Sequence, residues 1–243
     1  TFLLPSQTPH DSSFTPGQAR KVQQADLIIW LGSAAEPALA KLMARNKGRQ
    51  LAMLSLDGIH QREMQDGHDH HDHDDHAALD PHLWLSPDNM LVLARTLPAQ
   101  AAALGLDAAQ IDAGVARLAI RLEQQRARLQ QQLSPLANTP YMSHHDAWGY
   151  FADAFGLRPV IPLSASTELS PGSRRFTTLV RQIEQDNIRC FMAEPESRRA
   201  LLERLCREDC RIVEADPLGR QLGAVGYAAL LQDLADRFTT CMQ

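Results

Sequence analysis

The length, composition and charge of the chain exclude several classes of protein. It has 243 residues, 44% of them hydrophobic, which is enough for one large domain or two small ones. The net charge of -5 comes from 24 basic and 29 acidic residues, and no basic run is present, so no nucleic-acid partner is expected. No apolar stretch approaches the roughly 20 residues that a membrane-spanning helix needs.

The first residues, Thr1 to Pro5, suggest a strand that runs into a turn. A mature exported protein rarely begins in this way. We therefore expect the chain to lack its natural N-terminus, so a missing export signal says nothing about export.

Helices and strands alternate in the first quarter of the chain. Thr15 followed by Pro16 is typical of a capped helix start, and Leu27 to Leu31 is a short apolar run that favours a buried parallel strand. The expected helices are 16–25 and 37–46, and the expected strands are 27–31 and 51–54.

The segment from Asp66 to His76 holds five histidines and five aspartates without apolar periodicity, so we predict a mobile loop over 65–78. A purification tag is one alternative, but tags sit at termini and lack interleaved aspartate; a merely solvated loop is another. Because neutral imidazoles bind Zn²⁺, Cu²⁺ and Ni²⁺, we predict weak capture of several ions. The histidines concerned are His68, His70, His71, His73 and His76.

Two helices are expected in mid-chain, at 87–105 and 108–133. The second has apolar residues at helical spacing and would be roughly 35–40 Å long, long enough to join two lobes. Alternation then resumes, with strands 141–143, 160–163, 190–193 and 211–214 and helices 147–155, 172–185, 198–208 and 227–241. Such alternation predicts an α/β fold with parallel sheets. We predict an N-terminal lobe at 1–106, a connecting helix at 107–135 and a C-terminal lobe at 136–243.

Three histidines follow or approach the ends of expected strands. They are His10 after Pro9, His82 just before a helix, and His145 where a strand passes into a helix. Open α/β sheets bind ligands at the carboxyl ends of their strands, so these imidazoles can converge. Asp216, again just after a strand, is a fourth candidate. Imidazoles with one carboxylate suit Zn²⁺, although the same set can hold Mn²⁺.

Other polar residues near these positions have expected roles of their own. Asp11 and Asp146 each follow a candidate ligand, and either can orient an imidazole. His60 and His144 are expected at the surface. A zinc hydrolase also uses three histidines, but no His-Glu-x-x-His motif occurs. Glu168 and Glu194 are the only obvious bases, and we expect them at the surface or in hydrogen bonds between lobes, so no enzyme is predicted.

The four cysteines lie in the last third of the chain without a Cys-x-x-Cys pair, which disfavours a zinc ribbon or a thioredoxin-like motif. An even number in one region suits two disulfides in an oxidising compartment, and four buried thiols are the alternative. The residues are Cys190, Cys206, Cys210 and Cys241.

Taken in order, these motifs resemble the zinc-binding subunits of bacterial ABC transporters, the ZnuA group of cluster A-I solute-binding proteins. The resemblance covers nearly the whole chain. Its motifs are Leu4-Pro5 through Pro9-His10-Asp11, Ala25-Asp26-Leu27 with Gly32, the His/Asp-rich loop, Asp80-Pro81-His82-Leu83-Trp84-Leu85-Ser86-Pro87, His145 to Phe151, Glu168 to Gly172, Glu194-Pro195 and Asp216-Pro217-Leu218-Gly219.

The resemblance implies two α/β lobes joined by one long helix, with a metal ion in the cleft between them. It implies a monomer in the periplasm that captures Zn(II) and delivers it to a membrane permease. His10, His82 and His145 match the three imidazole ligands. Some members use a Glu immediately before the first of them; that residue is Pro9 here, which leaves Asp216 or water as the fourth ligand. Manganese-binding relatives carry Glu at the third position, so His145 favours zinc.

The resemblance also implies a disulfide between Cys190 and Cys241, which leaves Cys206 and Cys210 to bond to each other. A soluble periplasmic zinc chaperone and a metal-dependent adhesin remain alternatives to the importer subunit.

Overall fold

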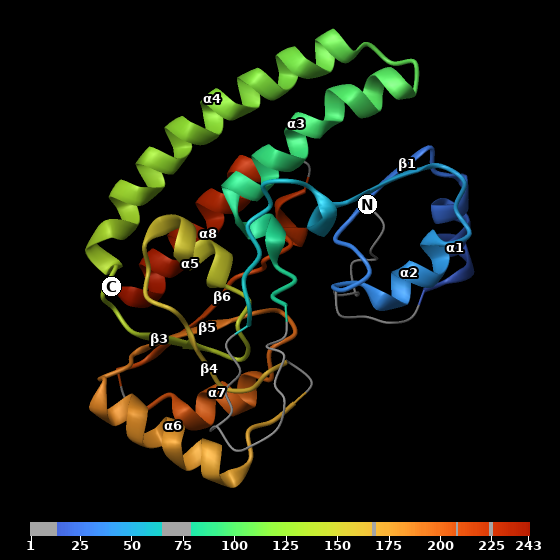
Figure 1. The fold of residues 1–243 in the computed structure, drawn as a ribbon. Coiled ribbons are helices and arrows are strands. Elements are labelled where there is room, and N and C mark those ends of the chain that lie inside the picture. Colours follow the sequence, from blue (N-terminus) through green and yellow to red (C-terminus); the bar gives the residue numbers. More distant parts are fainter. Residues whose placement is uncertain (1–13, 65–78, 167–168, 208, 224–225) are drawn as a thin grey trace. The chain divides into compact units, whose positions relative to one another are not determined.

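The computed structural model describes residues 14–64, 79–166, 169–207, 209–223 and 226–243 (Figure 1). Contacts group the chain into two compact units, one of Thr1–Gln61 with Pro87–Ile120 and the other of Arg62–Ser86 with Arg121–Gln243. The lobe boundaries predicted at 106 and 135 differ from this grouping and stay a prediction. Among the described residues, no helix is both long and apolar enough to cross a membrane.

The first unit opens with a small α/β layer. Helix α1, Pro16–Gln24, begins after Thr15, whose hydroxyl accepts from the backbone N–H of Gln18. The side chain of Gln18 accepts from the backbone N–H of Thr15, which completes a capping box. Strands β1, Leu27–Trp30, and β2, Arg49–Ala52, pair in parallel, with helix α2, Pro37–Met43, between them in sequence. Val22, Leu39 and Met43 form the core here.

Two longer helices follow, α3 at Pro87–Ala103 and α4 at Ala108–Leu133, and α4 has the predicted bounds. Gly105 lies between them with a φ of 71°, a left-handed conformation that glycine adopts without strain. The buried residues of α4 are Leu122, Leu129 and Leu133. They lie 7 and 4 residues apart, so only this part of the predicted apolar stripe is covered.

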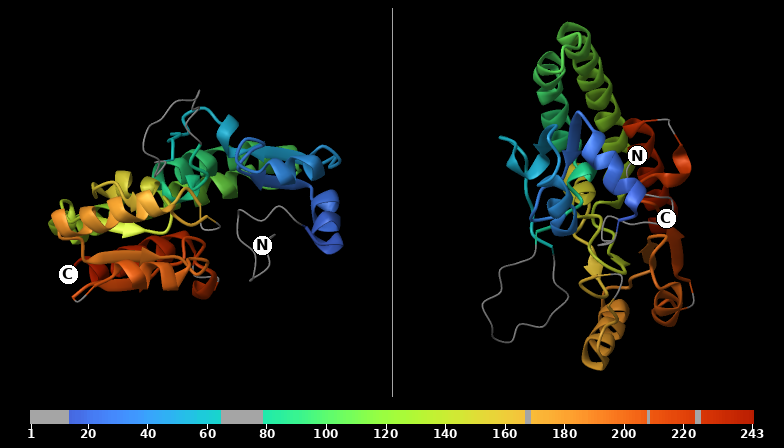
Figure 2. Two further views of the ribbon diagram at one scale, coloured as in Figure 1. Left: turned by 90° about the horizontal axis from the view of Figure 1, so that it is seen from below. Right: turned by 90° about the vertical axis from the view of Figure 1, so that its right-hand side faces the viewer.

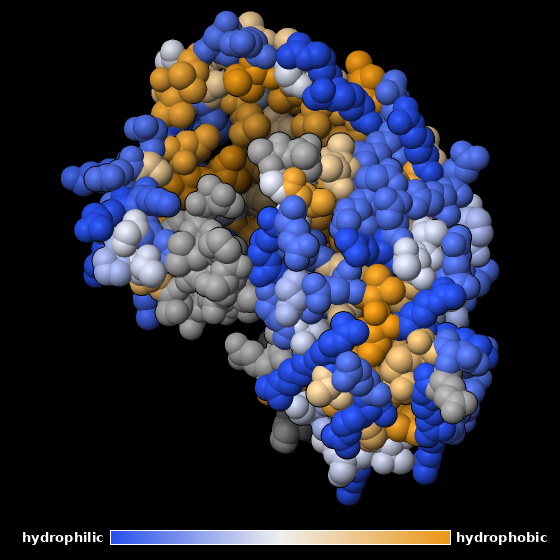
Figure 3. All heavy atoms as spheres, turned by 180° about the vertical axis from the view of Figure 1, so that it is seen from behind, coloured by the Kyte–Doolittle hydropathy of each residue, from blue (hydrophilic) through white to orange (hydrophobic). Residues whose placement is uncertain are grey.

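The second unit is built on a parallel sheet with the strand order β4-β3-β5-β6. Helices α6 and α7 lie on one face of the sheet, and α5 and α8 lie on the other (Figures 1 and 2). On the face drawn in Figure 3, hydrophilic side chains are interspersed with hydrophobic ones. The strands are β3 at Tyr141–Ser143, β4 at Ile161–Pro162, β5 at Cys190–Ala193 and β6 at Arg211–Glu214. The helices are α5 at Gly149–Phe155, α6 at Ser173–Gln185, α7 at Arg199–Leu205 and α8 at Tyr227–Met242.

The two faces of this sheet have different cores because side chains alternate along each strand. Met142 and Phe191 are register partners, and both belong to the core cluster that α6 and α7 share. Tyr141 and Cys190 pair one residue earlier and face α8, where Phe238 packs edge-on against Tyr141 at 5.3 Å. Each fully buried side chain of this kind contributes about 1.5–3 kcal/mol.

Two disulfides close the second unit. The predicted bond between Cys190 and Cys241 is confirmed, and it ties β5 to α8 with the two Cα atoms 5.1 Å apart. Cys206 and Cys210 are also bonded, with their Cα atoms 5.6 Å apart, and they join the end of α7 to the start of β6. Both Cα separations are usual for disulfides. The alternative of four buried thiols is therefore wrong.

Several predicted boundaries were wrong by a few residues. The strand expected at 51–54 ends at Ala52, because Met53–Ser55 turns into a 3₁₀ helix. The helix expected at 37–46 ends at Met43, and the side-chain amide of Asn46 instead donates to the carbonyl of Val22. The helix expected at 198–208 ends at Leu205, just before the Cys206–Cys210 bond.

Candidate metal centre

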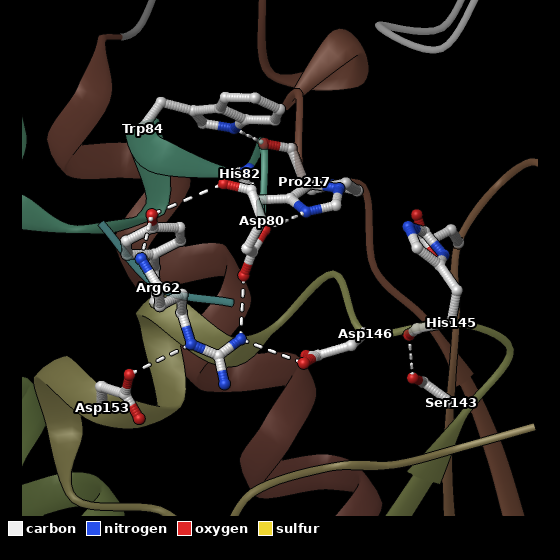
Figure 4. A network of polar contacts seen from close by, with 11 residues as sticks. Arg62, Asp80, His82, Trp84, Ser143, His145, Asp146, Asp153 and Pro217 are labelled. Atoms are coloured by element: carbon white, nitrogen blue, oxygen red, sulfur yellow. Dashed lines mark hydrogen bonds and ion pairs between the residues drawn. The ribbon is translucent and has the colours of Figure 1, made fainter. Parts of the chain in front are cut away.

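His82 is buried and oriented by a neighbouring carboxylate. It precedes the 3₁₀ turn Leu83–Leu85 and is 1% exposed. Oδ1 of Asp80 accepts from the backbone N–H of His82 at 2.9 Å and lies 2.7 Å from its Nδ1 (Figure 4). When Nδ1 donates to Asp80, the neutral ring carries its lone pair on Nε2. A carboxylate on the far nitrogen is the usual arrangement of a metal-binding histidine.

The carboxyl group of Asp80 stays ionised in this arrangement. Burial acts to raise its pKa, but the hydrogen bonds and charge of His82, together with Arg62, outweigh burial and hold the pKa of Asp80 below its ordinary value. An ionised Asp80 accepts from His82 throughout the neutral range, which keeps the ring in a single orientation.

His145 has the same kind of partner from another strand. It lies two residues beyond β3 and is 1% exposed, with Nδ1 2.7 Å from Oε1 of Glu194. Glu194 directly follows β5, is buried, and comes from the strand that pairs with β3. Burial acts to lower the pKa of His145, but the negative charge of Glu194, followed by Asp146 and Asp80, raises the pKa overall. When Nδ1 donates to Glu194, the neutral ring carries its lone pair on Nε2, as in His82.

The two imidazoles lie close together, with ring centroids 5.3 Å apart and an angle of 50° between their planes. Two nitrogens that share one zinc ion at about 2.0–2.1 Å are roughly 3.3 Å apart, so rings at this separation are compatible with a common ion. Trp84 packs against His82 with the two ring centroids 5.4 Å apart, and its indole N–H donates to the carbonyl of Pro217 at 2.8 Å. That contact brings the loop after β6 to the same edge of the sheet.

Asp216 lies in that loop, but its carboxylate has a cationic partner. It accepts from the backbone N–H of Leu218 and from the guanidinium of Arg220, whose Nη2 is 2.9 Å away. Arg220 also bonds Glu196. Within the described parts of the chain, no three metal-ligating side chains form a group. His10, Asp11, Glu168 and the five loop histidines lie outside the described residues.

Two predictions about this region were wrong. His144 was expected at the surface but is fully buried; Nδ1 accepts from the backbone N–H of Arg198, and Nε2 lies 3.3 Å from the carbonyl of Leu169. Burial lowers the pKa of His144, which is consistent with a neutral ring. Glu194 was expected at the surface or between lobes, yet it is buried beside His145 within one unit. His60 is exposed, as predicted.

The orienting carboxylates were only partly predicted. We expected Asp146 to orient an imidazole, and the structure shows its carboxylate accepting from Arg62 at 3.0 Å. Asp80 and Glu194 approach the two Nδ1 atoms instead. A signal for Glu194 was present in the sequence, since it follows an apolar strand in the same way as His145 follows β3. Arg62 was missed because an isolated arginine in a loop has no pattern.

Parallel sheets flanked by helices in two units, with two buried histidines whose Nδ1 atoms lie beside carboxylates, are typical of a metal-binding solute-binding protein of the α/β class. The family model described as "ZnuA: Zinc-uptake complex component A periplasmic" matches residues 1–241, and the chain belongs to this family. Members of the family are solute-binding proteins, so the chain is not an enzyme.

Individual relatives agree with the family assignment. The chain is 28% identical to the "High-affinity zinc uptake system protein ZnuA" of Yersinia pestis over 265 residues, covering 99% of this chain and 83% of that protein. It is 28% identical to the protein of the same name from Haemophilus ducreyi, with 99% and 85% covered. A crystal structure of ZnuA has a TM-score of 0.84 at 22% identity and covers 100% of this chain and 89% of the other. A zinc-bound ZnuA deletion mutant has a TM-score of 0.82 at 25% identity, with 100% and 88% covered.

Proposed function

We propose that the chain captures Zn²⁺ in the periplasm and delivers it to the membrane permease of an ABC importer. The observation that carries the proposal is the matched pair of His82 and His145. Each ring lies with Nδ1 2.7 Å from a buried carboxylate oxygen, which is the usual surrounding of a histidine that binds a metal ion. Relatives whose names describe zinc uptake support Zn²⁺ as the transported ion.

We further propose His10 as the third imidazole ligand and either Asp216 or water as the fourth ligand. Asp216 would have to release Arg220 before it could bind a cation, because Arg220 holds both of its oxygens. The ion pair between Asp216 and Arg220 therefore favours water over Asp216 as the fourth ligand. A site of three imidazoles favours zinc over manganese, which prefers oxygen ligands. Binding by a monomer and signalling of the loaded state to the permease are parts of the same proposal.

The His/Asp-rich segment is proposed as an accessory set of weak zinc sites. The residues that flank it are described: Glu63 and Leu79 form an antiparallel bridge, and the backbone N–H of Asp80 donates to the carbonyl of Arg62 at 2.9 Å. The segment therefore begins and ends beside the residues that orient His82.

The experiment that tests the function is a zinc titration by calorimetry of chelator-stripped protein. We expect one tight site and several weak ones in the intact chain. Deletion of residues 66–76 should remove the weak sites and leave the tight site in place. An intact chain with only weak sites would refute zinc capture by His82 and His145, and loss of the tight site on deletion would refute the accessory role of the segment.

Zinc binding should weaken in acid, because a protonated imidazole cannot bind a metal ion. Because the pKa of His145 is raised above the ordinary 6.5, protons begin to compete above that pH and continue to do so as pH falls. From pH 7.5 to 5.0 we expect His145 alone to weaken binding by at least about 30-fold, since pH 5.0 lies about 1.5 units below the ordinary value. Competition with a chelator of known proton affinity measures this change. If the zinc affinity did not change between pH 7.5 and 5.0, imidazole ligands would be excluded.

A further inference from the structure

Arg62 connects two buried carboxylates that belong to the metal centre. Its side chain is 12% exposed, and Nη1 donates to Oδ2 of Asp80 at 2.8 Å and to Oδ2 of Asp146 at 3.0 Å (Figure 4). Both carboxylates are fully buried. Burial acts to lower the pKa of Arg62, but Asp146 and Asp80 raise it overall, so the guanidinium keeps its charge.

These two carboxylates are part of the turns that carry the two described imidazoles. Asp80 divides its oxygens, with Oδ1 on His82 and Oδ2 on Arg62. Asp146 directly follows His145 in the chain. A single nitrogen of Arg62 therefore links the turn of His82 to the turn of His145.

The start of α5 provides the space that this guanidinium occupies. A Cβ atom on Gly149 would overlap the guanidinium of Arg62, so glycine is required there for this arrangement. The hydroxyl of Tyr150 accepts from the backbone N–H of Arg62 at 3.0 Å, and the Tyr150 ring lies 5.9 Å from its Cζ. Nε of Arg62 also lies 3.3 Å from the half-exposed Asp153. Main chain and side chain are thus both held in place.

We propose that Arg62 is a positioning residue of the zinc site, which fixes His82 and His145 at the separation that a shared ion needs. The proposal rests on the zinc-binding function proposed above. Arginine suits this role because its planar fork can serve several carboxylates at once, whereas a lysine ammonium is a single point of charge. Without the link, Oδ1 of Asp80 would still accept from the backbone N–H of His82, but Oδ2 would lose its cationic partner, and the carboxylate would fix the tautomer of His82 less firmly.

The test compares Arg62→Lys and Arg62→Gln with the intact chain. Zinc affinity is measured by chelator competition, and the tautomer of His82 is measured in metal-free protein by nitrogen NMR of the imidazole. We expect zinc to bind about 10–100-fold more weakly in both variants, as for other residues that orient metal ligands. We also expect the His82 signals to change from one Nδ1-protonated tautomer to a mixture. The thermal unfolding midpoint shows whether each variant is folded.

Two control substitutions separate this role from general destabilisation. Arg199→Lys alters an exposed ion pair with Glu203, and Arg207→Lys alters an exposed ion pair with Glu184. Both should bind zinc within about twofold of the intact chain, since exposed ion pairs contribute little. Similar losses in the controls and in the Arg62 variants would show a nonspecific effect and overturn the proposal.

The other possible outcomes also decide whether Arg62 positions the imidazoles. A folded Arg62→Lys protein with unchanged zinc affinity and an unchanged His82 tautomer would overturn the positioning role. Failure of both Arg62 variants to fold would make Arg62 a structural residue only. If the intact chain bound no zinc tightly, the proposed function would fail. The metal-free NMR comparison would then still show whether Arg62 orients His82.

Discussion

Replacement of His82 or His145 by alanine should weaken zinc binding by about 10²–10³-fold. Structural zinc sites contribute roughly 10–16 kcal/mol through about four ligands, so one ligand accounts for about 2.5–4 kcal/mol. Both imidazoles lie with Nδ1 2.7 Å from a carboxylate, and we expect losses of similar size from the two substitutions. Calorimetry with a competing chelator measures both affinities.

Two further variants serve as comparisons for the histidine substitutions. His60→Ala changes an exposed histidine and should leave the affinity unchanged. Asp216→Ala should cost less than about tenfold if the Arg220 ion pair keeps this carboxylate away from the ion, with water as the fourth ligand. Full zinc affinity in both His82→Ala and His145→Ala would place the tight site elsewhere.

Loss of the Cys190–Cys241 disulfide should destabilise the protein more than loss of the Cys206–Cys210 disulfide. The first joins residues 51 positions apart and the second residues 4 positions apart. Loop-closure entropy then gives about 4 kcal/mol for the first bond and about 2 kcal/mol for the second. Double alanine variants of each pair, compared by guanidinium unfolding, measure the difference.

Zinc affinity separates this effect from damage to the metal centre. Cys190 begins β5, whereas Glu194 follows the other end of that strand, so removal of the disulfide should leave zinc binding within about threefold of the intact chain. An equal loss of stability in the two double variants would contradict the loop-length argument.

Most elements of the fold could be predicted from the sequence because their signals are local. The bounds of α4, β3, β5 and β6 were predicted correctly, since α4 has apolar residues at helical spacing and each of the three strands has an apolar centre between turn residues. The errors of a few residues fall at ends where a tertiary contact decides, such as the Asn46 side chain that donates to the carbonyl of Val22. Propensity alone does not contain such contacts.

The candidate site was predictable to a smaller extent. His82 and His145 were predicted from their motifs and from family resemblance, and the structure brings their rings together. Only His145 lies beyond the end of a strand, because His82 precedes the 3₁₀ turn Leu83–Leu85. The carboxylates that approach these rings could not be predicted, because a sequence does not distinguish a buried carboxylate from an exposed one. Glu194 approaches His145 only because β5 is the neighbour of β3, and strand order is a property of the whole sheet.

The second unit is discontinuous in the chain, and this affects how it can be produced and how it folds. Residues 62–86 belong with residues 121–243, although a stretch of the other unit separates them in sequence. A fragment that starts at residue 121 would contain the whole four-stranded sheet but would lack Arg62, Asp80 and His82. Supplying residues 62–86 as a separate peptide offers a complementation assay, in which zinc would promote association of the two pieces. In the intact chain, the metal centre must close a long loop, so we expect it to form late in folding.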